Sequence, residues 1–531
     1  GMRRWNGWGD DSIDYPLPNA ARAFLEALVG VGAPSPSVSL AEVVQKVSAS
    51  RLPAYPLVNL DPLPRALHAC GQSMPDWIAL HSGNLQAFPD GVATPENEDE
   101  IQQLIRYAQQ CGAALIPYGG GTSVVGHINP QPGSQPVLTV DMSRMNRLIH
   151  YDAQSHLATF GAGVTGPDLE AQLRARHSTL GHYPQSFEYS TLGGWVATRS
   201  SGQQSLRYGR IEKLFAGGRL VSPSGCLELP AFPASAAGPD LRELVLGSEG
   251  RLGILSEVTV RVSKLPELEE FHAVFFPNFE HGCEAVRQML LAGLPLALLR
   301  LSTAIETTTT LALAGHEVLI GALEKLLAIR GLGNDKCMLL LGFSGSGSLV
   351  RTVRGEALGM ASRQGGVTVG RVFGEQWIKN RFRTPYLRNS LWDLGFAVDT
   401  LETATGWNQV PRLLANIETA LHSAMHEINE RVHVFTHHSH LYPHGSSIYT
   451  TYLFRAAADP QETLQRWFRL KTAASQVIVE LGGTISHQHG VGRDHAPYLL
   501  AEKGTLGMDL LADTCRSLDP DGIMNPGKLL L

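Results

Sequence analysis

The sequence predicts an α+β protein with at least two packed domains, and three observations support this fold class. The chain has 531 residues, more than a single hydrophobic core normally organises. From about Pro89 to Val262, short β-branched runs alternate with amphipathic helical patterns, which is typical of mixed α/β layers. At Lys264–Pro266 the pattern changes to longer helices mixed with strands, which continue to about Ala474. We interpret this second region as an α/β cap domain that covers the first.

The first α/β unit has the clearest pattern. Thr94 is expected to cap a helix that begins with Pro95 and Glu96 and ends at Gly112. Its apolar stripe consists of Ile101, Leu104, Ile105 and Ala108. A short buried strand, Ala113–Pro117, follows and leads into a glycine-rich loop. Further strands are expected at residues 136–140, 157–160, 219–221 and 254–262, separated by turn signals.

Composition and charge exclude some classes of protein. Hydrophobic residues make up 43% of the chain and charged residues 17%, as in a globular protein. Lys and Arg total 43 against 49 Asp and Glu, and this net charge of -6 argues against a nucleic-acid partner. The six cysteines are scattered without the spacing of a zinc or dithiol motif, so we expect them to be reduced and structural.

The sequence also gives expectations about location. The first residues lack the apolar core of a secretory signal, so a cytoplasmic location is expected. The most apolar stretch, Met289–Leu301, contains Pro295 and reaches Arg300 too early to span a bilayer of about 30 Å. We expect it to form a core helix. The alternative is a surface patch that lies on lipid, so a peripheral membrane contact is left open.

Three glycine-rich segments lie between Pro117 and Ile254. The first, Pro117–Gly126, follows a strand, and its consecutive glycines would let backbone N–H groups point at a phosphate. It has neither the glycine spacing of a dinucleotide fingerprint nor the lysine of a P-loop. The second, Gly181–Ser200, holds a glycine pair between hydroxyl residues, and the third is Gly247–Ile254. One glycine loop is usually structural, but three together could surround a long ligand.

In this order, the three segments resemble the FAD domain of the vanillyl-alcohol oxidase, or PCMH-type, flavoprotein superfamily. The resemblance implies an N-terminal segment at 1–85, a PCMH-type two-lobed FAD-binding domain at 86–265 and a cap or substrate domain at 266–490. The turn-rich stretch Asp519–Lys528 predicts that the C-terminal segment, 491–531, returns to the FAD domain. Some relatives attach the flavin to a histidine of the first loop, where this chain has only Thr122 and Ser123, so we expect non-covalent FAD. The residues implied to bind FAD are Pro117, Tyr118, Gly119, Gly120, Gly121, Thr122, Ser123, Gln185, Ser186, Phe187, Glu188, Tyr189, Ser190, Thr191, Thr198, Arg199, Ser200, Ser201, Glu249, Gly250, Leu252, Gly253 and Ile254.

Within this superfamily the chain resembles the alkyldihydroxyacetonephosphate synthase family. The resemblance is weakest between about Thr303 and Thr384, and it is carried by Trp5–Gly9, Ser143–Asn146, Thr191–Arg199 and Phe276–Phe279. It implies that the flavin N5 forms an adduct with an acyl-dihydroxyacetone phosphate, that the fatty acid leaves, and that a fatty alcohol takes its place in ether lipid synthesis. A small-molecule or lipid-like substrate and a homodimer are expected.

Candidate catalytic residues lie near the end of the sequence. Six histidines occur in the segments His437–His444 and Ser486–Gly492, and imidazoles can hold or move protons near neutral pH. The resemblance implies that Tyr449 is the acid/base residue, that His487 and His489 tune it, and that Arg388 clamps the substrate phosphate. His437 and His440 are expected to contact the substrate. The family has a third histidine where this chain has Gln488, which can form hydrogen bonds but cannot relay a proton.

Three alternatives stay open. A related branch, the FAD-linked D-2-hydroxyacid dehydrogenases, binds a metal through two histidines spaced like His437 and His444 and a glutamate at the position of Gln488. An amide is a poor substitute for that carboxylate, so no metal is expected. The rival function is an FAD-linked oxidase or dehydrogenase of a 2-hydroxy acid or alcohol, which the terminal Asn525–Lys528 favours and in which Arg388 would bind a carboxylate. A flavin-binding protein without turnover is the third alternative.

Overall fold

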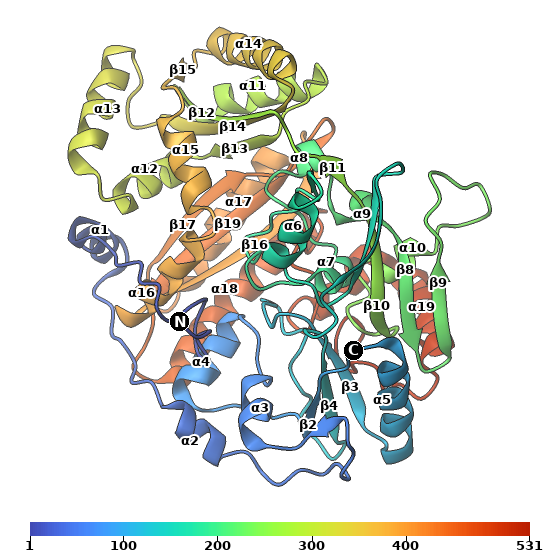
Figure 1. Ribbon diagram of the computed structural model, residues 1–531. Coiled ribbons are helices and arrows are strands. Elements are labelled where there is room, and N and C mark those ends of the chain that lie inside the picture. Colours follow the sequence, from blue (N-terminus) through green and yellow to red (C-terminus); the bar gives the residue numbers. More distant parts are fainter.

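Two sheets form the first half of the molecule (Figure 1). The computed structural model describes residues 1–531. A four-stranded sheet has the order β1-β2-β4-β3, in which β2, β4 and β3 are parallel, and a five-stranded antiparallel sheet has the order β5-β6-β10-β8-β9. The strands are β1 (Val58–Asn59), β2 (Gly91–Ala93), β3 (Ala114–Tyr118), β4 (Val137–Asp141), β5 (Leu148–Asp152), β6 (Leu157–Gly161), β8 (Phe215–Ser222), β9 (Gly225–Leu229) and β10 (Ile254–Arg261). The α+β class is therefore confirmed.

Short helices accompany these two sheets. The helices are α1 (Asn19–Val29), α2 (Leu40–Gln45), α3 (Pro62–Leu67), α4 (Met74–Ser82), α5 (Glu98–Cys111), α6 (Gly166–Arg174), α7 (Leu192–Thr198), α8 (Ser205–Tyr208), α9 (Ile211–Leu214) and α10 (Arg242–Val245). The strands β7 (Ser178–Thr179) and β11 (Ser263–Lys264) form a small antiparallel pair. Strand β11 comes directly before the first strand of the cap.

Helix α5 begins three residues after the predicted start. The cap is Asn97 instead of Thr94, because the Asn97 side chain accepts a hydrogen bond of 2.9 Å from the backbone N–H of Glu100. Three acidic residues in the first turn complement the helix dipole. The predicted end is correct, since Gly112 adopts the left-handed conformation with φ +67°.

The cap is built on an eight-stranded antiparallel sheet. Its order is β15-β12-β14-β13-β17-β19-β16, and β18 pairs with β19. Its strands are β12 (Leu268–Phe276), β13 (Leu298–Ser302), β14 (Cys337–Gly345), β15 (Val367–Thr368), β16 (Phe396–Gly406), β17 (Val432–His438), β18 (Leu441–Tyr442) and β19 (Gly445–Arg455).

Helices cover both faces of the cap sheet (Figure 1). Side chains of β12 and β14 alternate between two clusters, one formed with α11 and α14 and the other with α12, α13 and α15. Helices α17 and α18 pack on the β16–β19 half, together with α4 from the N-terminal segment. The cap helices are α11 (Phe279–Leu291), α12 (Ala304–Leu313), α13 (Glu317–Ile329), α14 (Gly347–Arg363), α15 (Val372–Asn380), α16 (Leu387–Asp393), α17 (Val410–His426), α18 (Pro460–Glu480) and α19 (Leu499–Leu518), with 3-10 turns at Thr384–Tyr386 and Ala496–Tyr498.

The expected core helix at Met289–Leu301 does not exist as one element. Helix α11 ends at Leu291, and the buried strand β13 begins at Leu298. Between them, Gly293 has φ +67° and Pro295 cannot continue a helix, so the apolar run is divided into a helix end, a turn and a strand. None of the helices is long and apolar enough to cross a membrane.

The segment after α19 runs back into the first sheet. Met524 bridges Leu115 of β3, and the backbone N–H of Asn525 donates to the Leu115 carbonyl at 2.8 Å. Farther along, the N–H of Leu529 donates to the Gly492 carbonyl at 3.0 Å. The C label beside β3 marks this return (Figure 1). The segment after α19 therefore contacts both the first sheet and the residues that follow the cap.

Candidate active site

A long pocket runs between the two sheets and the cap sheet, and all three glycine-rich segments line it. We call it the FAD pocket. The loop 117–123 contributes every one of its predicted residues, and the cap contributes Tyr449, Gln488 and His489. The other predicted residues in its wall are Gln185, Ser186, Ser190, Thr191, Thr198, Ser200, Glu249, Gly250, Gly253 and Ile254.

The first glycine loop fits a phosphate group. A Cβ atom at Gly120 would overlap the carbonyl oxygen of Tyr189, and one at Gly119 would overlap the Thr191 hydroxyl. The two loops therefore pack backbone against backbone, which only glycine permits. The backbone N–H groups of Gly120, Gly121 and Thr122 donate to no acceptor in the protein. These free donors, next to a wall without side chains, suit the pyrophosphate of FAD.

Six of the predicted FAD residues lie outside the pocket wall. Phe187 stacks on Phe382 with ring centroids 4.8 Å apart, and the ring of Tyr189 meets Trp8 at 5.6 Å. Leu252 belongs to the apolar core, and Ser201 lines a neighbouring cavity. The other two are Glu188 and Arg199.

Arg199 is turned away by its ion pairs with Glu212 at 3.3 Å and Glu243 at 2.9 Å. Glu188 is half-buried near Tyr386 and Arg383. Burial raises the pKa of its carboxyl, whereas the charge of Arg383 and a hydrogen bond with Tyr386 lower it. Residues next to Glu188 and Arg199 do line the pocket. Only some residues of each predicted loop therefore face the ligand.

Fifteen residues in the wall of the FAD pocket were not predicted from the sequence, and two of them, His127 and Asn525, connect parts of this wall. His127 lies between the Ser123 hydroxyl, 2.7 Å from its Nδ1, and the Glu249 carboxylate, which faces its Nε2. Asn525 donates from Nδ2 to the carbonyls of His127 (3.0 Å) and Glu249 (2.8 Å), and thereby joins two walls of the pocket. Lys528, which is fully buried, donates to Asn525 Oδ1 at 2.8 Å, and burial lowers its pKa to about 7. The Asn525–Lys528 motif was the available signal.

A second, smaller cavity adjoins the FAD pocket inside the cap, and we call it the cap cavity. It shares Gln185, Tyr449 and Gln488 with the FAD pocket. Most of its lining residues are of polar types. The lining residues are Gln185, Ser201, Gln203, Leu298, Arg300, Trp377, His437, Ser439, His440, Tyr449 and Gln488. A ligand held here would lie beside the part of the FAD pocket that Tyr449 and Gln488 line.

Tyr449 separates the two cavities. It lies on β19, opposite Glu402 on β16 and His437 on β17. Its ring stacks on His437 with centroids 4.5 Å apart, and His489 approaches edge-on at 6.1 Å. Burial raises the pKa of Tyr449 well above its ordinary value, so the phenol is protonated at neutral pH.

The first carboxylate–imidazole pair at the cap cavity is Glu306 with His437. Glu306 Oε1 lies 2.9 Å from His437 Nδ1 and 3.5 Å from Arg300 Nη2. Burial, followed by the charge of Arg300, lowers the pKa of His437. Burial opposes ionisation of Glu306, but His437 and Arg300 together hold the pKa of this carboxyl below its usual range. Neither Arg300 nor Glu306 was predicted.

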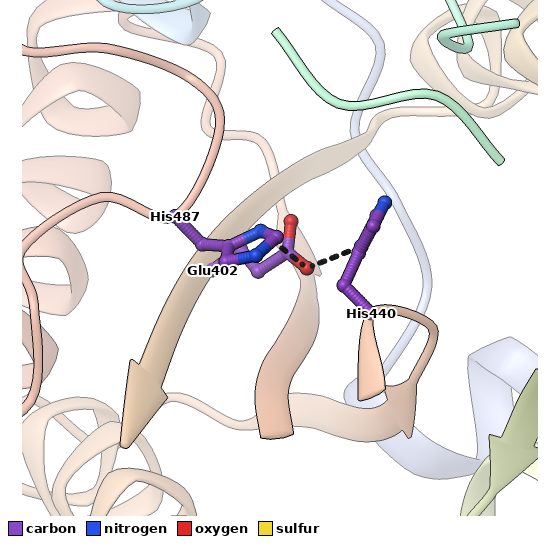
Figure 2. Close-up of side chains that lie close together, drawn as sticks. All are labelled: Glu402, His440 and His487. Atoms are coloured by element: carbon purple, nitrogen blue, oxygen red, sulfur yellow. Dashed lines mark hydrogen bonds and ion pairs between the residues drawn. The ribbon is translucent and has the colours of Figure 1, made fainter. Parts of the chain in front are cut away.

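The second pair is Glu402 with His440, and His487 lies beside it (Figure 2). Gln488 also contacts this carboxylate. Glu402 Oε1 lies 3.1 Å from His440 Nδ1 and 3.3 Å from His487 Nδ1, and Gln488 Nε2 donates to the other oxygen at 2.5 Å. The carboxylate is fully buried. Burial opposes its charge, but the two imidazoles hold its pKa well below the usual range. Glu402 is therefore an ionised carboxylate inside the protein.

Arg210 determines which nitrogen of His487 carries the proton. The Nε2 atom of His487 is 2.8 Å from Arg210 Nη1 and 2.7 Å from the Tyr442 hydroxyl. A guanidinium can only donate, so Nε2 accepts and Nδ1 carries the hydrogen toward Glu402. Burial lowers the pKa of His487 to about 4, which keeps this ring neutral.

The same geometry bears on metal binding at Glu402, His440 and His487, whose ligand atoms lie within 4.8 Å of one another. A metal on His487 Nδ1 would have to replace its proton while Arg210 still occupies Nε2, and this would require an imidazolate. The donor set therefore suits protons better than a metal ion. His444, in the other predicted pair, is exposed in the turn before β19 and lines neither cavity, whereas His437 is buried.

Arg388 lies beneath the site instead of in its wall. It lines neither cavity, its guanidinium is 4.0 Å above the Trp77 ring, and Nη1 donates to the Gln72 carbonyl at 2.6 Å. Its Nε and Nη2 atoms have no partner. Burial lowers the pKa of Arg388 to about 10, so the group is still cationic at neutral pH.

Two family models match the chain in the regions described above. The FAD binding domain family matches residues 89–228, and the family of FAD linked oxidases, C-terminal domain, matches residues 265–529. The first match contains the first two glycine-rich segments, and the second contains the whole cap sheet and the returning C-terminal segment.

Two curated relatives that cover nearly the whole chain have the same name. Alkyldihydroxyacetonephosphate synthase of Dictyostelium discoideum is 31% identical over 92% of this chain and 80% of its own, and that of Trypanosoma brucei brucei is 28% identical over 99% and 92%. A solved structure of an alkyldihydroxyacetonephosphate synthase superposes with a TM-score of 0.84 at 27% identity, covering 99% of this chain and 98% of its own. FAD is therefore the cofactor of this protein, and the chain belongs to the alkyldihydroxyacetonephosphate synthase family of FAD-dependent enzymes.

Proposed function

We propose that this enzyme exchanges the acyl group of an acyl-dihydroxyacetone phosphate for a fatty alcohol, which is the first step that creates an ether bond. One observation carries the proposal: Tyr449 and Gln488 belong to the FAD pocket and to the polar cap cavity at once. A substrate in the cap cavity would therefore face the flavin. Bound FAD would supply the electrophilic centre at which the exchange takes place.

The cap cavity suits the phosphate head of this substrate. Arg300 supplies a fixed positive charge, and a guanidinium matches the geometry of phosphate oxygens. The Ser201 hydroxyl and Gln203 Oε1 are buried without a hydrogen-bond partner, and both residues line the cavity. We assign the phosphate to Arg300, His437 and Ser201. Arg388, which lies outside both cavities, is assigned a supporting role below the site through its charge.

Tyr449 is the group that we propose to act as the proton donor toward the substrate. Its phenol begins protonated because burial raises its pKa, and it lies between the stacked His437 and the edge of His489. His489, whose pKa burial lowers, lines the FAD pocket as a neutral hydrogen-bonding group. His487 contacts Glu402, which lies opposite Tyr449 in the cap sheet, and it supports the arrangement through this carboxylate.

A lipid-like substrate has to reach the site from a membrane, and we propose a peripheral membrane contact through helix α13. Val318 and Ile329 on this helix are 90% and 82% exposed, which is unusual for large apolar side chains. Non-covalent attachment of the FAD, a homodimer and a cytoplasmic location stay predictions from the sequence.

An anaerobic absorbance titration of the FAD-loaded protein tests the proposed function. Adding an acyl-dihydroxyacetone phosphate should decrease the flavin absorbance, and adding a fatty alcohol without oxygen should restore it while the alkyl product forms. A panel of 2-hydroxy acids should leave the spectrum unchanged. If a hydroxy acid alone decreased the absorbance, and only an electron acceptor restored it, the protein would be a dehydrogenase and the proposed exchange would be wrong.

A further inference from the structure

Two carboxylate–imidazole dyads face the cap cavity from neighbouring parts of the cap sheet. They are the Glu306–His437 dyad and the Glu402–His440 dyad. In each, the histidine Nδ1 points to the carboxylate and the ring lines the cavity. This orientation leaves Nε2 as the ring atom available to a ligand. The two dyads look equivalent, so their other neighbours must decide what each can do.

Proton transfer at this site needs an acceptor besides Tyr449. The exchange removes one proton from the hydroxyl of the incoming alcohol, and this proton must reach a base when the new carbon–oxygen bond forms. Tyr449 is a protonated phenol at neutral pH, and Gln488 cannot accept a proton from an alcohol. Among the residues that the two cavities share, none is a base.

The Glu306–His437 dyad is poorly suited to take up this proton. Arg300 Nη2 lies 3.5 Å from Glu306 and already neutralises part of the carboxylate charge that would stabilise an imidazolium. Arg300 also lowers the pKa of His437, second to burial. A second positive charge on His437 would therefore be opposed by the first. This dyad is better suited to bind an anion.

The Glu402–His440 dyad lacks such a cation in direct contact with its carboxylate. The other neighbours of Glu402 are uncharged. They are the neutral His487 ring, whose Nδ1 lies 3.3 Å away, and the Gln488 amide, which donates a hydrogen bond. His440 is 4% exposed, and its Nε2 atom is buried without a hydrogen-bond partner. Figure 2 shows the His440 ring with one nitrogen toward Glu402 and the other directed away from it.

We propose that His440, oriented by Glu402, is the general base that accepts the proton of the incoming alcohol. The inference rests on the proposed function and assigns a catalytic residue to its second half. The carbon–oxygen bond to the acyl group breaks first, and the carboxylate leaves with the bonding electrons. The alcohol oxygen then bonds to the same carbon, its O–H bond breaks, and the proton moves to His440 Nε2. The proton then passes from His440 to solvent. The exchange releases one carboxylate and one proton in total, so no oxidant is consumed. Glu402 is a positioning residue, because it holds Nδ1 and stabilises the imidazolium.

Separate measurement of the two half-reactions tests this assignment. The first is release of fatty acid by the FAD-loaded enzyme without alcohol, and the second is formation of the alkyl product after alcohol is added. In His440→Gln and Glu402→Gln, the first should stay within about threefold of wild type. The second should slow by roughly 10²- to 10⁴-fold, the usual contribution of a general base. Glu306→Gln is the matched control in the other dyad, and it should raise the KM for the acyl phosphate without slowing the alcohol step.

Chemical rescue distinguishes catalysis from a structural role. Free imidazole should restore the alcohol step of His440→Ala, and substituted imidazoles should restore it in the order of their basicity. Normal alcohol rates in both His440→Gln and His440→Ala would overturn the assignment while the exchange function stands. Absence of both half-reactions in the wild-type enzyme would overturn the proposed function itself, and the assignment with it.

Discussion

Tyr449 and the charged residues around it show what a sequence can reveal about single residues. Tyr449 and the histidines were found because they cluster within short segments that resemble a known pattern. Arg300, Glu306 and Glu402 were not found, since a single charged residue within a strand or helix gives no local signal. Only the strand register places Glu402 opposite Tyr449 and brings the segments around 402, 440 and 487 together. Long-range pairing of this kind cannot be read from periodicity.

Replacing Tyr449 by Phe should lower turnover by roughly 10²- to 10⁴-fold, because it removes the proposed proton donor and little volume. FAD content and Tm should stay close to wild type, since the Tyr449 ring still stacks on His437. Steady-state exchange assays and the flavin spectrum check this. Tyr498→Phe, at a partly buried position outside both cavities, is the matched control. Undiminished turnover in Tyr449→Phe would remove Tyr449 from the mechanism.

At the scale of elements, the sequence predicted correctly those features that depend on the backbone conformation of glycine. The glycine loops were predicted because only glycine allows the close packing of 119–120 on 189–191. The end of α5 at Gly112 was predicted for a similar reason. Its start was missed because Thr94 and Asn97 are both good caps, and the choice depends on which side chain reaches a free N–H. The apolar run at 289–301 was misread because periodicity alone does not separate a helix from a buried strand.

Gly120→Ala should abolish FAD binding in the glycine loop, because the added methyl group would overlap the Tyr189 carbonyl and force the two loops apart. The protein should purify without yellow colour, and added FAD should not raise its Tm. Gly355→Ala is the control, since a Cβ at Gly355 in α14 meets no atom within 4 Å and Ala favours a helix. Gly120→Ala with a full complement of flavin would contradict the assignment of this loop to the pyrophosphate.

At the scale of the whole molecule, the pocket depends on parts that lie far apart in the sequence. The cap sheet supplies Tyr449 and His489, the two smaller sheets supply the glycine loops, and the segment after α19 joins them. The sequence predicted that this segment returns, from its turn-rich composition. It could not show that Asn525 holds the carbonyls of both His127 and Glu249.

Asn525→Ala removes both of these hydrogen bonds, each worth about 0.5–1.5 kcal/mol. The Kd for FAD should therefore rise by roughly 5- to 150-fold. Quenching of flavin fluorescence on titration of the apoprotein measures the change. Asn416→Ala, which removes one exposed hydrogen bond on α17, should leave the Kd unchanged. An unchanged Kd in Asn525→Ala would mean that the two loops keep their positions without this side chain.

The position of Asn525 in the sequence has a consequence for biogenesis. It lies 398 residues after His127 and 276 residues after Glu249, the two partners that it holds together. A ribosome that adds about 5–20 residues per second synthesises Asn525 roughly 15 to 80 s after these two loops. Until this segment has been synthesised, the two loops lack the hydrogen bonds from Asn525, and we expect them to bind flavin weakly. Loading of the cofactor becomes a late quality-control step, and nascent chains that stall before residue 519 should accumulate as colourless substrates for chaperones and proteases.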